Sequence, residues 1–424
     1  MTTTTTHIDK KEQLVPTLRF KEFVEEWESR VFGEYVLESA FGPRFSSNLY
    51  SKGGRIATLR TTDMDLEGNI CYETMPTANL ELAEVKDHIL ENNDIVISRS
   101  GTIGITGIYE DYKIPVIPGA FLIRFRIDAN KLNSHFIKHK FNSDLGRNLL
   151  TSLSAGGVQK NLTGTSVKQA KLNIPSLPEQ QKIAAFLSAV DEKIQQLTRK
   201  KELLEQYKKG VMQKLFSQEI QFKQDDGSNY PNWEEKRLGE LIEICSSKRV
   251  LQEDWKDEGV PFLRTREIIN LSNNVKFRTP IFISETLFEE LKTRYGVPKS
   301  DDILATGVGT IGELYIVHKT DRFYFKDGNV LWFKMNGSLD SNYVSQLFKT
   351  RFIRKQLFDN ASITTVATFT IEGANKTKII YPCIKEQQKI ADYLSAIDNK
   401  IESVNNQITQ TQTFKKGLLQ QMFV

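Results

Sequence analysis

Two groups of side chains in the sequence have types and spacing that could support catalysis. Glu234–Lys236 contains a Glu-x-Lys triplet of the kind found in nucleases, and His135 and His139 have the i, i+4 spacing of a metal pair on one helix face. The triplet is common by chance. No third metal ligand is evident beside the histidines, so a pair on a surface helix is the better interpretation. The sequence therefore predicts no catalytic residue and no metal site.

Nucleotide chemistry has an equally weak signal. The sequence lacks a GxxxxGK[ST] loop and lacks the Asp/Asn-Pro-Pro-aromatic motif that adenine methyltransferases use. Gly101–Gly104 could be a phosphate cradle, but it recurs as Gly309–Gly312 in a similar strand-like context. That recurrence favours a structural tight turn. We therefore expect no cofactor on this chain.

The composition is that of an ordinary globular chain of 424 residues, long enough for about two to four domains. Its 57 basic and 53 acidic residues leave a net charge of +4, so any DNA-binding face must be local. The sequence has no long apolar run and no signal-peptide pattern, which predicts a cytoplasmic protein without membrane contact. Three distant cysteines, Cys71, Cys245 and Cys383, indicate reduced thiols.

The chain contains an internal repeat. Glu179–Ala184 recurs as Glu386–Ala391, an offset of 386 − 179 = 207 residues, and Pro178–Ile194 shares 12 of 17 residues with Lys385–Ile401. Nearby offsets align Trp27 with Trp233, Gly33 with Gly239, Leu59–Thr61 with Leu263–Thr265, and the two glycine motifs. The sequence therefore predicts a duplicated protein, in which each half is a globular lobe followed by a helix of about 40 residues.

Each predicted helix carries apolar residues at alternating steps of four and three, the pattern of a coiled-coil seam. The first seam consists of Ile183, Leu187, Val190, Ile194, Leu197, Leu204, Val211 and Leu215. The second consists of Ile390, Leu394, Ile397, Ile401, Val404, Ile408, Leu418 and Met422. Lys201 and Lys208 interrupt the first, and Thr411 and Lys415 the second. We expect the two seams to bury each other, although each could instead lie on its own lobe.

The connection between the first helix and the second lobe is short, which fixes the expected direction of the helices. A helix of this length spans roughly 57 Å, so the second lobe begins far from the first and the second helix must return antiparallel. The predicted fold class is α/β (α+β): two similar lobes separated by an antiparallel coiled coil and related by an approximate two-fold axis. The expected boundaries are a flexible tail at 1–16, a lobe at 17–177, a helix at 178–217, a second lobe at 218–384 and a second helix at 385–424.

The lobes themselves have a mixed pattern. Asp94–Ser98 and Gly119–Phe125 are predicted to be strands. Ser341–Phe358 is predicted to be helical with one apolar face, and its basic residues are expected to face solvent.

Side chains suited to base contacts follow the strand-like and glycine-rich segments. Arginine pairs with guanine, and Asn or Gln with adenine, each pair giving about 1–3 kcal/mol of discrimination. The candidates in the first lobe are Arg60, Thr61, Arg99, Ser100, Gln159, Lys160 and Asn161. In the second lobe they are Arg264, Thr265, Arg266 and Thr306, the last aligned with Arg99 and Ser100. For each of them, surface solvation or an internal salt bridge is the competing interpretation.

Four segments, in their order along the chain, resemble the DNA specificity subunit of type I restriction-modification systems. They are Asp94–Gly104, Ser152–Leu162, Asn173–Ala184 and Gly259–Ile268. The resemblance extends from about Thr17 to Val424. It implies that each lobe is a target recognition domain reading one half of a split, asymmetric double-stranded DNA sequence, and that the helices hold the lobes apart. It also implies a non-catalytic chain bound to two adenine methyltransferase subunits. Restriction subunits would join the larger complex, with S-adenosylmethionine, ATP and Mg on these partners.

Two other functions stay open. One is a scaffold whose lobes bind proteins; the other is a self-sufficient DNA-modifying enzyme, which the missing motifs argue against. The second lobe also departs from the first at the glycine array: Gly157, Gln159 and Asn161 correspond to Thr364, Val366 and Thr368. This difference argues against a common recognition loop there, but two different half-sites would require it.

Overall fold

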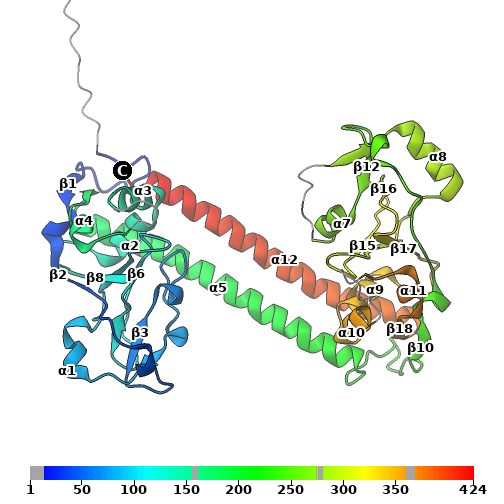
Figure 1. The fold of residues 1–424 in the computed structure, drawn as a ribbon, viewed down its shortest axis with the longest axis horizontal. Helices are drawn as coiled ribbons and strands as arrows, with labels where there is room; N and C mark the ends of the chain where they lie inside the picture. The colour runs from blue at the N-terminus through cyan, green and yellow to red at the C-terminus, as the bar shows by residue number, and fades with distance from the viewer. Residues whose placement is uncertain (1–13, 155–160, 274, 276–279, 360–367) are drawn as a thin grey trace, which may run out of the picture. The chain divides into compact units, whose positions relative to one another are not determined.

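The computed structural model describes residues 14–154, 161–273, 275, 280–359 and 368–424 (Figure 1). The chain forms two compact units, Met1–Arg199 with Asn405–Val424, and Lys200–Val404. Each unit therefore contains one lobe together with parts of both long helices. Residues 14–16 were expected in the tail, but Leu14 packs on the first lobe and its carbonyl accepts the Trp27 amide at 3.0 Å. The rest of the predicted tail lies outside the described residues.

The lobe of the first unit contains two larger sheets and one strand pair. The four-stranded sheet has the antiparallel order β2-β8-β5-β6, the three-stranded sheet has the order β4-β3-β7 with β3 parallel to β7, and β1 pairs with β9. The strands are β1 (Glu28–Val31), β2 (Val36–Phe41), β3 (Ile56–Leu59), β4 (Thr77–Ala78), β5 (Ile95–Ser98), β6 (Thr106–Ile108), β7 (Val116–Pro118), β8 (Leu122–Ile127) and β9 (Lys171–Ile174). The helices are α1 (Leu82–Val85), α2 (Ser134–Asn142), α3 (Asp144–Ser152) and α4 (Gly164–Lys168).

The lobe of the second unit repeats this topology, with sheets β11-β17-β14-β15 and β13-β12-β16 and the pair β10-β18. Its strands are β10 (Glu234–Arg237), β11 (Glu243–Cys245), β12 (Val260–Leu263), β13 (Ile281–Ile283), β14 (Ile303–Thr306), β15 (Leu314–Ile316), β16 (Tyr324–Phe325), β17 (Val330–Lys334) and β18 (Lys378–Tyr381). Its helices are α6 (Leu238–Leu241), α7 (Thr265–Ser272), α8 (Glu285–Tyr295), α9 (Ser341–Phe348), α10 (Arg351–Asp359) and α11 (Ile371–Lys376).

The inner strands β5 and β14 each begin with three apolar residues, because both faces of these strands are covered. In β5, Ile95 and Ile97 pack with the core beneath α2 and α3, whereas Val96 faces a second core behind the sheet. In β14, Ile303 and Leu304 divide between two cores in the same way. The strand predicted at Asp94–Ser98 is therefore present, beginning at Ile95.

Two predicted elements differ in their bounds. The strand expected from Gly119 begins at Leu122, because the Gly119 amide donates to the Leu59 carbonyl at 2.7 Å and holds the preceding residues in a turn. The helix expected over Ser341–Phe358 is two helices, α9 and α10. The Thr350 hydroxyl accepts the Ile353 amide at 3.4 Å, in the manner of a helix cap, where the second helix begins.

Helices α5 (Leu177–Phe216) and α12 (Ile384–Gln421) begin and end within three residues of the predicted bounds. α5 begins in the first unit, where α12 ends, so the helices run in opposite directions there (Figure 1). The predicted seam residues of both helices are all buried or half-buried. A seam of this kind removes apolar side chains from water along each helix pair.

Two of the lysines that interrupt the seams, Lys208 and Lys415, make ion pairs between the helices. In the second unit the Lys208 ammonium lies 2.6 Å from the Asp398 carboxylate. In the first unit Lys415 lies 2.7 Å from Asp191. Both partners are related by the repeat, since 415 − 208 = 207 and 398 − 191 = 207. The interruptions are therefore a repeated polar layer within the helix pair.

The repeated Glu-Gln-Gln-Lys-Ile-Ala segment joins each long helix to its lobe. In the first unit Glu179 accepts hydrogen bonds from Arg19 at 2.7 Å and from the Trp27 indole at 3.3 Å. The Gln180 side chain accepts the Asn133 amide at 2.9 Å, just before α2. These side chains are almost fully buried at the start of α5, which explains why the segment recurs.

The same joint in the second unit is built with fewer charges. Glu386 accepts the Trp233 indole at 3.2 Å, and Gln387 accepts the Asp340 amide at 2.8 Å, just before α9. Among the described residues, no arginine or lysine forms an ion pair with Glu386. Burial raises the pKa of this carboxyl group, and the Trp233 hydrogen bond only partly offsets that effect.

The end of each long helix completes the core of a lobe. Phe423, just beyond α12, has its ring centroid 5.5 Å from that of Phe136 in the first unit. Phe216, at the end of α5, lies 5.7 Å from Tyr343 in the second. Each unit therefore depends on a helix end that comes from the other half of the sequence.

Candidate nucleic-acid interface

The first candidate arginine stands at the end of β3. The Arg60 guanidinium binds the Asp63 carboxylate through two hydrogen bonds of 2.9 and 2.8 Å, and the Asp63 carboxylate also accepts the Arg60 amide at 2.8 Å. Burial by itself would raise the pKa of Asp63, but the Arg60 contacts outweigh it and lower that pKa. The Arg60 side chain is still 44% exposed. The internal salt bridge therefore holds the arginine in place without removing it from the surface.

The second unit repeats this corner at the end of β12. Arg264 binds Glu267 through hydrogen bonds of 3.0 and 2.9 Å, again three residues along the chain. Arg266 contacts the same carboxylate at 3.1 Å and leaves 60% of its side chain exposed. The Thr265 hydroxyl lies 3.5 Å from the Asn329 carbonyl, whereas Thr61 in the first unit is half-buried. The residue pattern Arg-x-x-acid thus builds the same strand end twice.

The glycine motif is a tight turn between two antiparallel strands, β5 and β6. The Ser98 hydroxyl donates to the Thr102 carbonyl at 2.6 Å and accepts the Ile105 amide at 2.8 Å. Gly101 and Gly104 have φ angles of 72° and 82°, which L side chains rarely adopt. The turn is therefore held by its own hydrogen bonds, as its recurrence in the sequence predicted.

The turn of the second unit corrects the alignment of Thr306. Its hydroxyl donates to the Thr310 carbonyl and accepts the Glu313 amide at 3.0 Å, the two roles that Ser98 has in the first unit. Thr306 therefore corresponds to Ser98 and not to Arg99 and Ser100. The Thr306 side chain is fully buried. A direct contact between Thr306 and a base thus has no support in the structure.

Of the candidate arginines, Arg99 is the one whose charge is least engaged. Its guanidinium lies 4.5 Å from the centroid of the Phe41 ring, a cation–π contact, and no carboxylate in the described part of the chain lies within ion-pair distance of it. Its amide donates to the Phe121 carbonyl at 3.0 Å, and its carbonyl accepts the Leu162 amide at 2.9 Å. These bonds bring the β7–β8 turn and the segment after Asn161 to the glycine turn.

The candidates of the first unit thus form one surface, which we call the first corner surface. It consists of Arg60, Thr61, Arg99, Ser100, Phe121 and Asn161. Gly119 links the Arg60 part of this surface to Phe121, because its amide donates a hydrogen bond to the carbonyl of Leu59, the residue before Arg60. Phe121 is 62% exposed and was not among the predicted candidates. Gln159 and Lys160 were predicted candidates, but they lie outside the described residues.

The second corner surface has the same backbone with different side chains. It consists of Arg264, Thr265, Arg266, Asn329 and Thr368, arranged around the buried Gly307. The Gly307 amide donates to the Asn329 carbonyl at 2.8 Å, and the Phe369 amide to the Gly307 carbonyl at 2.8 Å. Gly307 therefore occupies the place of Arg99, and Asn329 the place of Phe121. The repeat pairs Phe121 with Asn329 at an offset of 329 − 121 = 208 residues, but the position of Phe121 beside Arg99 follows only from the fold.

The residues considered for catalysis lie elsewhere. His139 is 2% exposed and lies 3.3 Å from the Ser188 hydroxyl, so the prediction of a surface histidine pair was wrong for this residue. Burial, together with the positive charges of Lys138 and Lys415, lowers the pKa of His139. The Glu234–Lys236 triplet lies in β10, where Lys236 pairs with Glu234 at 3.1 Å. In the described part of the chain, no three His, Cys, Asp or Glu side chains gather as a metal site would require.

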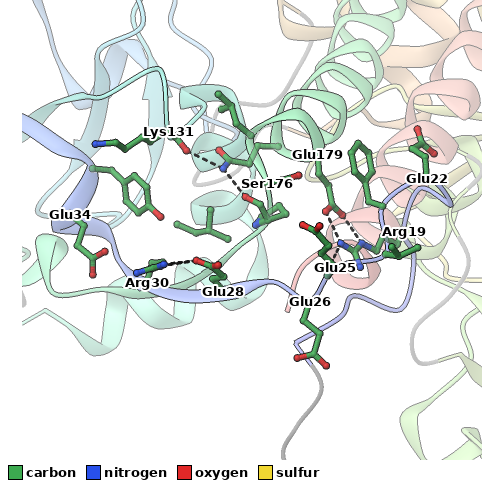
Figure 2. Close-up of a pocket in the computed structure, with 17 residues that line it drawn as sticks. Arg19, Glu22, Glu25, Glu26, Glu28, Arg30, Glu34, Lys131, Ser176 and Glu179 are labelled. Carbon is green, nitrogen blue, oxygen red and sulfur yellow. Dashed lines mark hydrogen bonds and ion pairs between the residues drawn. The ribbon is translucent and has the colours of Figure 1, made fainter.

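A hollow of about 750 Å³ in the first unit has the wrong charge for DNA (Figure 2). It lies at the start of α5, beside the Arg19–Glu179 ion pair. Its carboxylates outnumber its three basic side chains; they are Glu22, Glu25, Glu26, Glu28, Glu34 and Glu179. A polyanion would be repelled there, so the corner surface is the better candidate.

No described helix is both long enough and apolar enough to cross a bilayer.

A family model and curated relatives both match this sequence, and they name the same family. Residues 24–206 and 230–412 each match the family model described as the type I restriction modification DNA specificity domain. A putative type I restriction enzyme specificity subunit from Haemophilus influenzae is 25% identical over 355 residues, which cover 82% of this chain and 84% of that protein. A putative type I restriction enzyme MjaX specificity subunit from Methanocaldococcus jannaschii is 25% identical, covering 96% of this chain and 95% of the relative.

A solved structure has the same fold. It is the S subunit of a type I restriction-modification system from M. genitalium, with a TM-score of 0.61 and 16% identity, covering 97% of this chain and 99% of that one. A chain from a study of complex assembly and conformational transition of the type I system has a TM-score of 0.54 and 16% identity, covering 93% of this chain and 96% of that one.

Proposed function

Because the chain belongs to the family of type I restriction-modification DNA specificity subunits, whose role is DNA target recognition, we propose that each unit reads one part of a bipartite, asymmetric target through its corner surface. The observation that carries this proposal is the repeated backbone frame, which carries different residues in the two units. Arg99 and Phe121 in one unit stand where Gly307 and Asn329 stand in the other. Two copies of one frame with unlike contact residues are suited to two unlike half-sites.

The proposed assembly follows from the repeat as well. Two copies of an adenine methyltransferase subunit would bind equivalent surfaces on the two halves, and restriction subunits would join the larger complex. In this proposal the chain is non-catalytic and acts in the cytoplasm. S-adenosylmethionine, ATP and Mg would be bound by the partner subunits. The approximate two-fold relation between the lobes stays a prediction.

The test is methylome sequencing of cells that express this chain with its methyltransferase partner. Replacing residues 17–177 by the equivalent lobe of another family member should change one half of the methylated motif and leave the other half intact. Each lobe has its own corner surface, so one replacement can alter only one reading surface. Altered methylation in both halves, or in neither, would contradict the proposal.

A single substitution sharpens the same experiment. Arg99→Gln keeps a polar side chain but loses the guanidinium, so it should relax or change one base position in the half-site read by the first unit, with a loss of about 1–3 kcal/mol for the original base. Arg30→Gln is the matched control, because Arg30 is an exposed arginine of the same unit that pairs with Glu28, away from the corner surface. The control should methylate the unchanged motif.

A further inference from the structure

The second unit contains an open groove between the end of α5, helix α12 and the junction of α9 with α10. Its volume is about 790 Å³, and most of its surface is apolar. Met212, Phe216 and Ile401 are half-buried along it, and Phe352 is 46% exposed at its edge. The Lys208–Asp398 ion pair also lines it.

The first unit has the same groove at an offset of 207 residues, but it is much smaller. Leu419 corresponds to Met212, Ile194 to Ile401, and the pair Lys415–Asp191 to Lys208–Asp398. Its volume is about 350 Å³. The difference in volume arises from a segment of the first lobe that enters the groove.

That segment is the turn around Glu67. The Glu67 carboxylate forms an ion pair with Lys415, in addition to the Asp191 contact of that lysine. The Asn142 side chain donates to the Glu67 carbonyl at 3.1 Å, and the Lys138 ammonium donates to Asn69 at 2.9 Å. The first unit therefore fills its groove with an acidic turn of its own chain.

The second unit uses the corresponding residues differently. Its chain forms α7 there, and Leu271, which corresponds to Glu67, packs against the core of the lobe. Within the described residues, Lys208 forms an ion pair with Asp398 alone. The neighbouring segment 273–279 has the sequence NNVKFRT, which contains no acidic residue that could replace Glu67.

The edge of the open groove is also more positive than its counterpart. Lys349 and Arg351 stand where the first unit has Asn142 and Asp144. Lys209 also lines the open groove, but its counterpart Lys416 lines the smaller one, so the difference in charge comes from Lys349 and Arg351. In the described part of the chain, no carboxylate lies within ion-pair distance of Lys209, Lys349 and Arg351, all of which are exposed.

We propose that this groove docks an acidic loop of a partner protein, which takes the place that the Glu67 turn has in the first unit. The loop would present a carboxylate to the cluster of Lys208, Lys209, Lys349 and Arg351 and cover Phe352 with apolar side chains. DNA fits the positive edge but not the apolar floor, because a phosphate backbone has no apolar surface with which to cover Met212 and Phe352. The inference rests on the proposed assembly with other subunits and adds a contact specific to the second unit.

The test is site-specific photo-crosslinking in the complex of the full chain with its methyltransferase subunits. A benzophenone side chain at position 352 should crosslink to a peptide of a partner subunit that contains Asp or Glu, identified by mass spectrometry. The matched control is position 145, because Leu145 corresponds to Phe352 and is 54% exposed beside the filled groove. The crosslink yield at 352 should exceed that at 145 by about tenfold or more.

A second variant tests the charge argument. Lys349→Asn with Arg351→Asp gives the groove the residues of the first unit, and should reduce the crosslink yield at position 352 by about tenfold. A crosslink at 352 to DNA, to a second copy of the chain or to its own segment 273–279 would overturn the proposal, as would a yield equal to that at 145. If the partner subunits do not copurify with the unmodified chain, the proposed assembly itself fails, which is a separate result.

Discussion

The two units build the same joint between lobe and helix with different charges. In the first, Glu179 is neutralised by Arg19, and Lys140 lies buried with its ammonium 5.5 Å from the Trp27 ring centroid and 3.0 Å from the Val424 carbonyl. In the second, Glu386 lacks such an arginine among the described residues, and the residue corresponding to Lys140 is the buried Leu347. Packing and hydrogen bonds recur, whereas charge does not. The shared joint therefore depends on shape, and at this joint the two copies diverge in their positive charges.

The largest expected effect concerns the aromatic residues that end the long helices. Phe423→Ala should cost about 3–5 kcal/mol of unfolding free energy in the first unit, because Phe423 is 2% exposed and packs in the core. Phe216→Ala should cost the second unit less, since Phe216 is only half-buried. Hydrogen exchange of peptides from each lobe reports the two units separately. Phe414→Ala, at a site 55% exposed on α12, is the control and should leave both unchanged. Equal losses for Phe423 and Phe216 would contradict the comparison.

Replacing Glu179 and Glu386, the corresponding carboxylates of the two joints, should change stability in opposite directions. Glu179→Gln should destabilise the first unit at pH 7 by about 2–3 kcal/mol, because it leaves the mostly buried Arg19 without its partner. Glu386→Gln should be neutral or stabilising by less than about 1 kcal/mol. Folding raises the pKa of the Glu386 carboxyl group. Just above the ordinary glutamate pKa, the native state therefore binds more protons than the unfolded state, and the free energy of unfolding falls as the pH rises.

Measuring stability at different pH values therefore tests the prediction for Glu179 and Glu386. The advantage of Glu386→Gln should be present at pH 7 and vanish below the ordinary glutamate pKa, where both states of the parent chain are protonated. Hydrogen exchange of the second lobe at two pH values measures it. An equal loss of stability in both variants at pH 7 would contradict the prediction, because it would mean that an ionic partner also stabilises Glu386.

A smaller effect than that of Glu179→Gln is expected for the buried lysine. Burial lowers the pKa of Lys140 to about 8. Its ordinary pKa is higher, so the unfolded state binds more protons between these values, and the stability of the first unit should rise with pH across that window. Lys140→Leu, which copies Leu347, should remove this slope and stabilise the first unit at pH 7 by about 1–2 kcal/mol. Thermal unfolding between pH 7 and 10 tests it, and a variant less stable than the parent at pH 7 would contradict it.

The sequence was sufficient to predict the long helices and the duplication, because burial of a seam produces a periodic pattern that is local to each helix. It could not assign a role to Lys208 and Lys415, since their partners lie on the other helix and are known only when its direction and register are fixed. The buried position of His139 was missed for the same reason: α2 is covered by α5, and Ser188 of that helix contacts the imidazole.

The candidate contact residues were predicted less completely. The acidic residue three positions after Arg60 was visible in the sequence and could have indicated the internal salt bridge. Thr306 was misplaced although the glycine motifs align at an offset of 309 − 101 = 208 residues, which already pairs Thr306 with Ser98. Phe121 was missed because its exposure depends on the turn that holds Gly119 to Leu59, a contact between residues 60 positions apart.

The closure of the first unit by the far end of the chain sets an order on its folding during synthesis. The Leu18 amide donates to the Gln421 carbonyl at 2.9 Å, and Phe423 completes the packing around Phe136. The second unit, by contrast, is assembled from Lys200–Val404, all of which leaves the ribosome earlier. The lobe that is made first therefore acquires its native core last. Until residues 405–424 have been synthesised, its apolar interior stays open to chaperones and proteases, so a chain terminated before them presents exposed core surface for degradation.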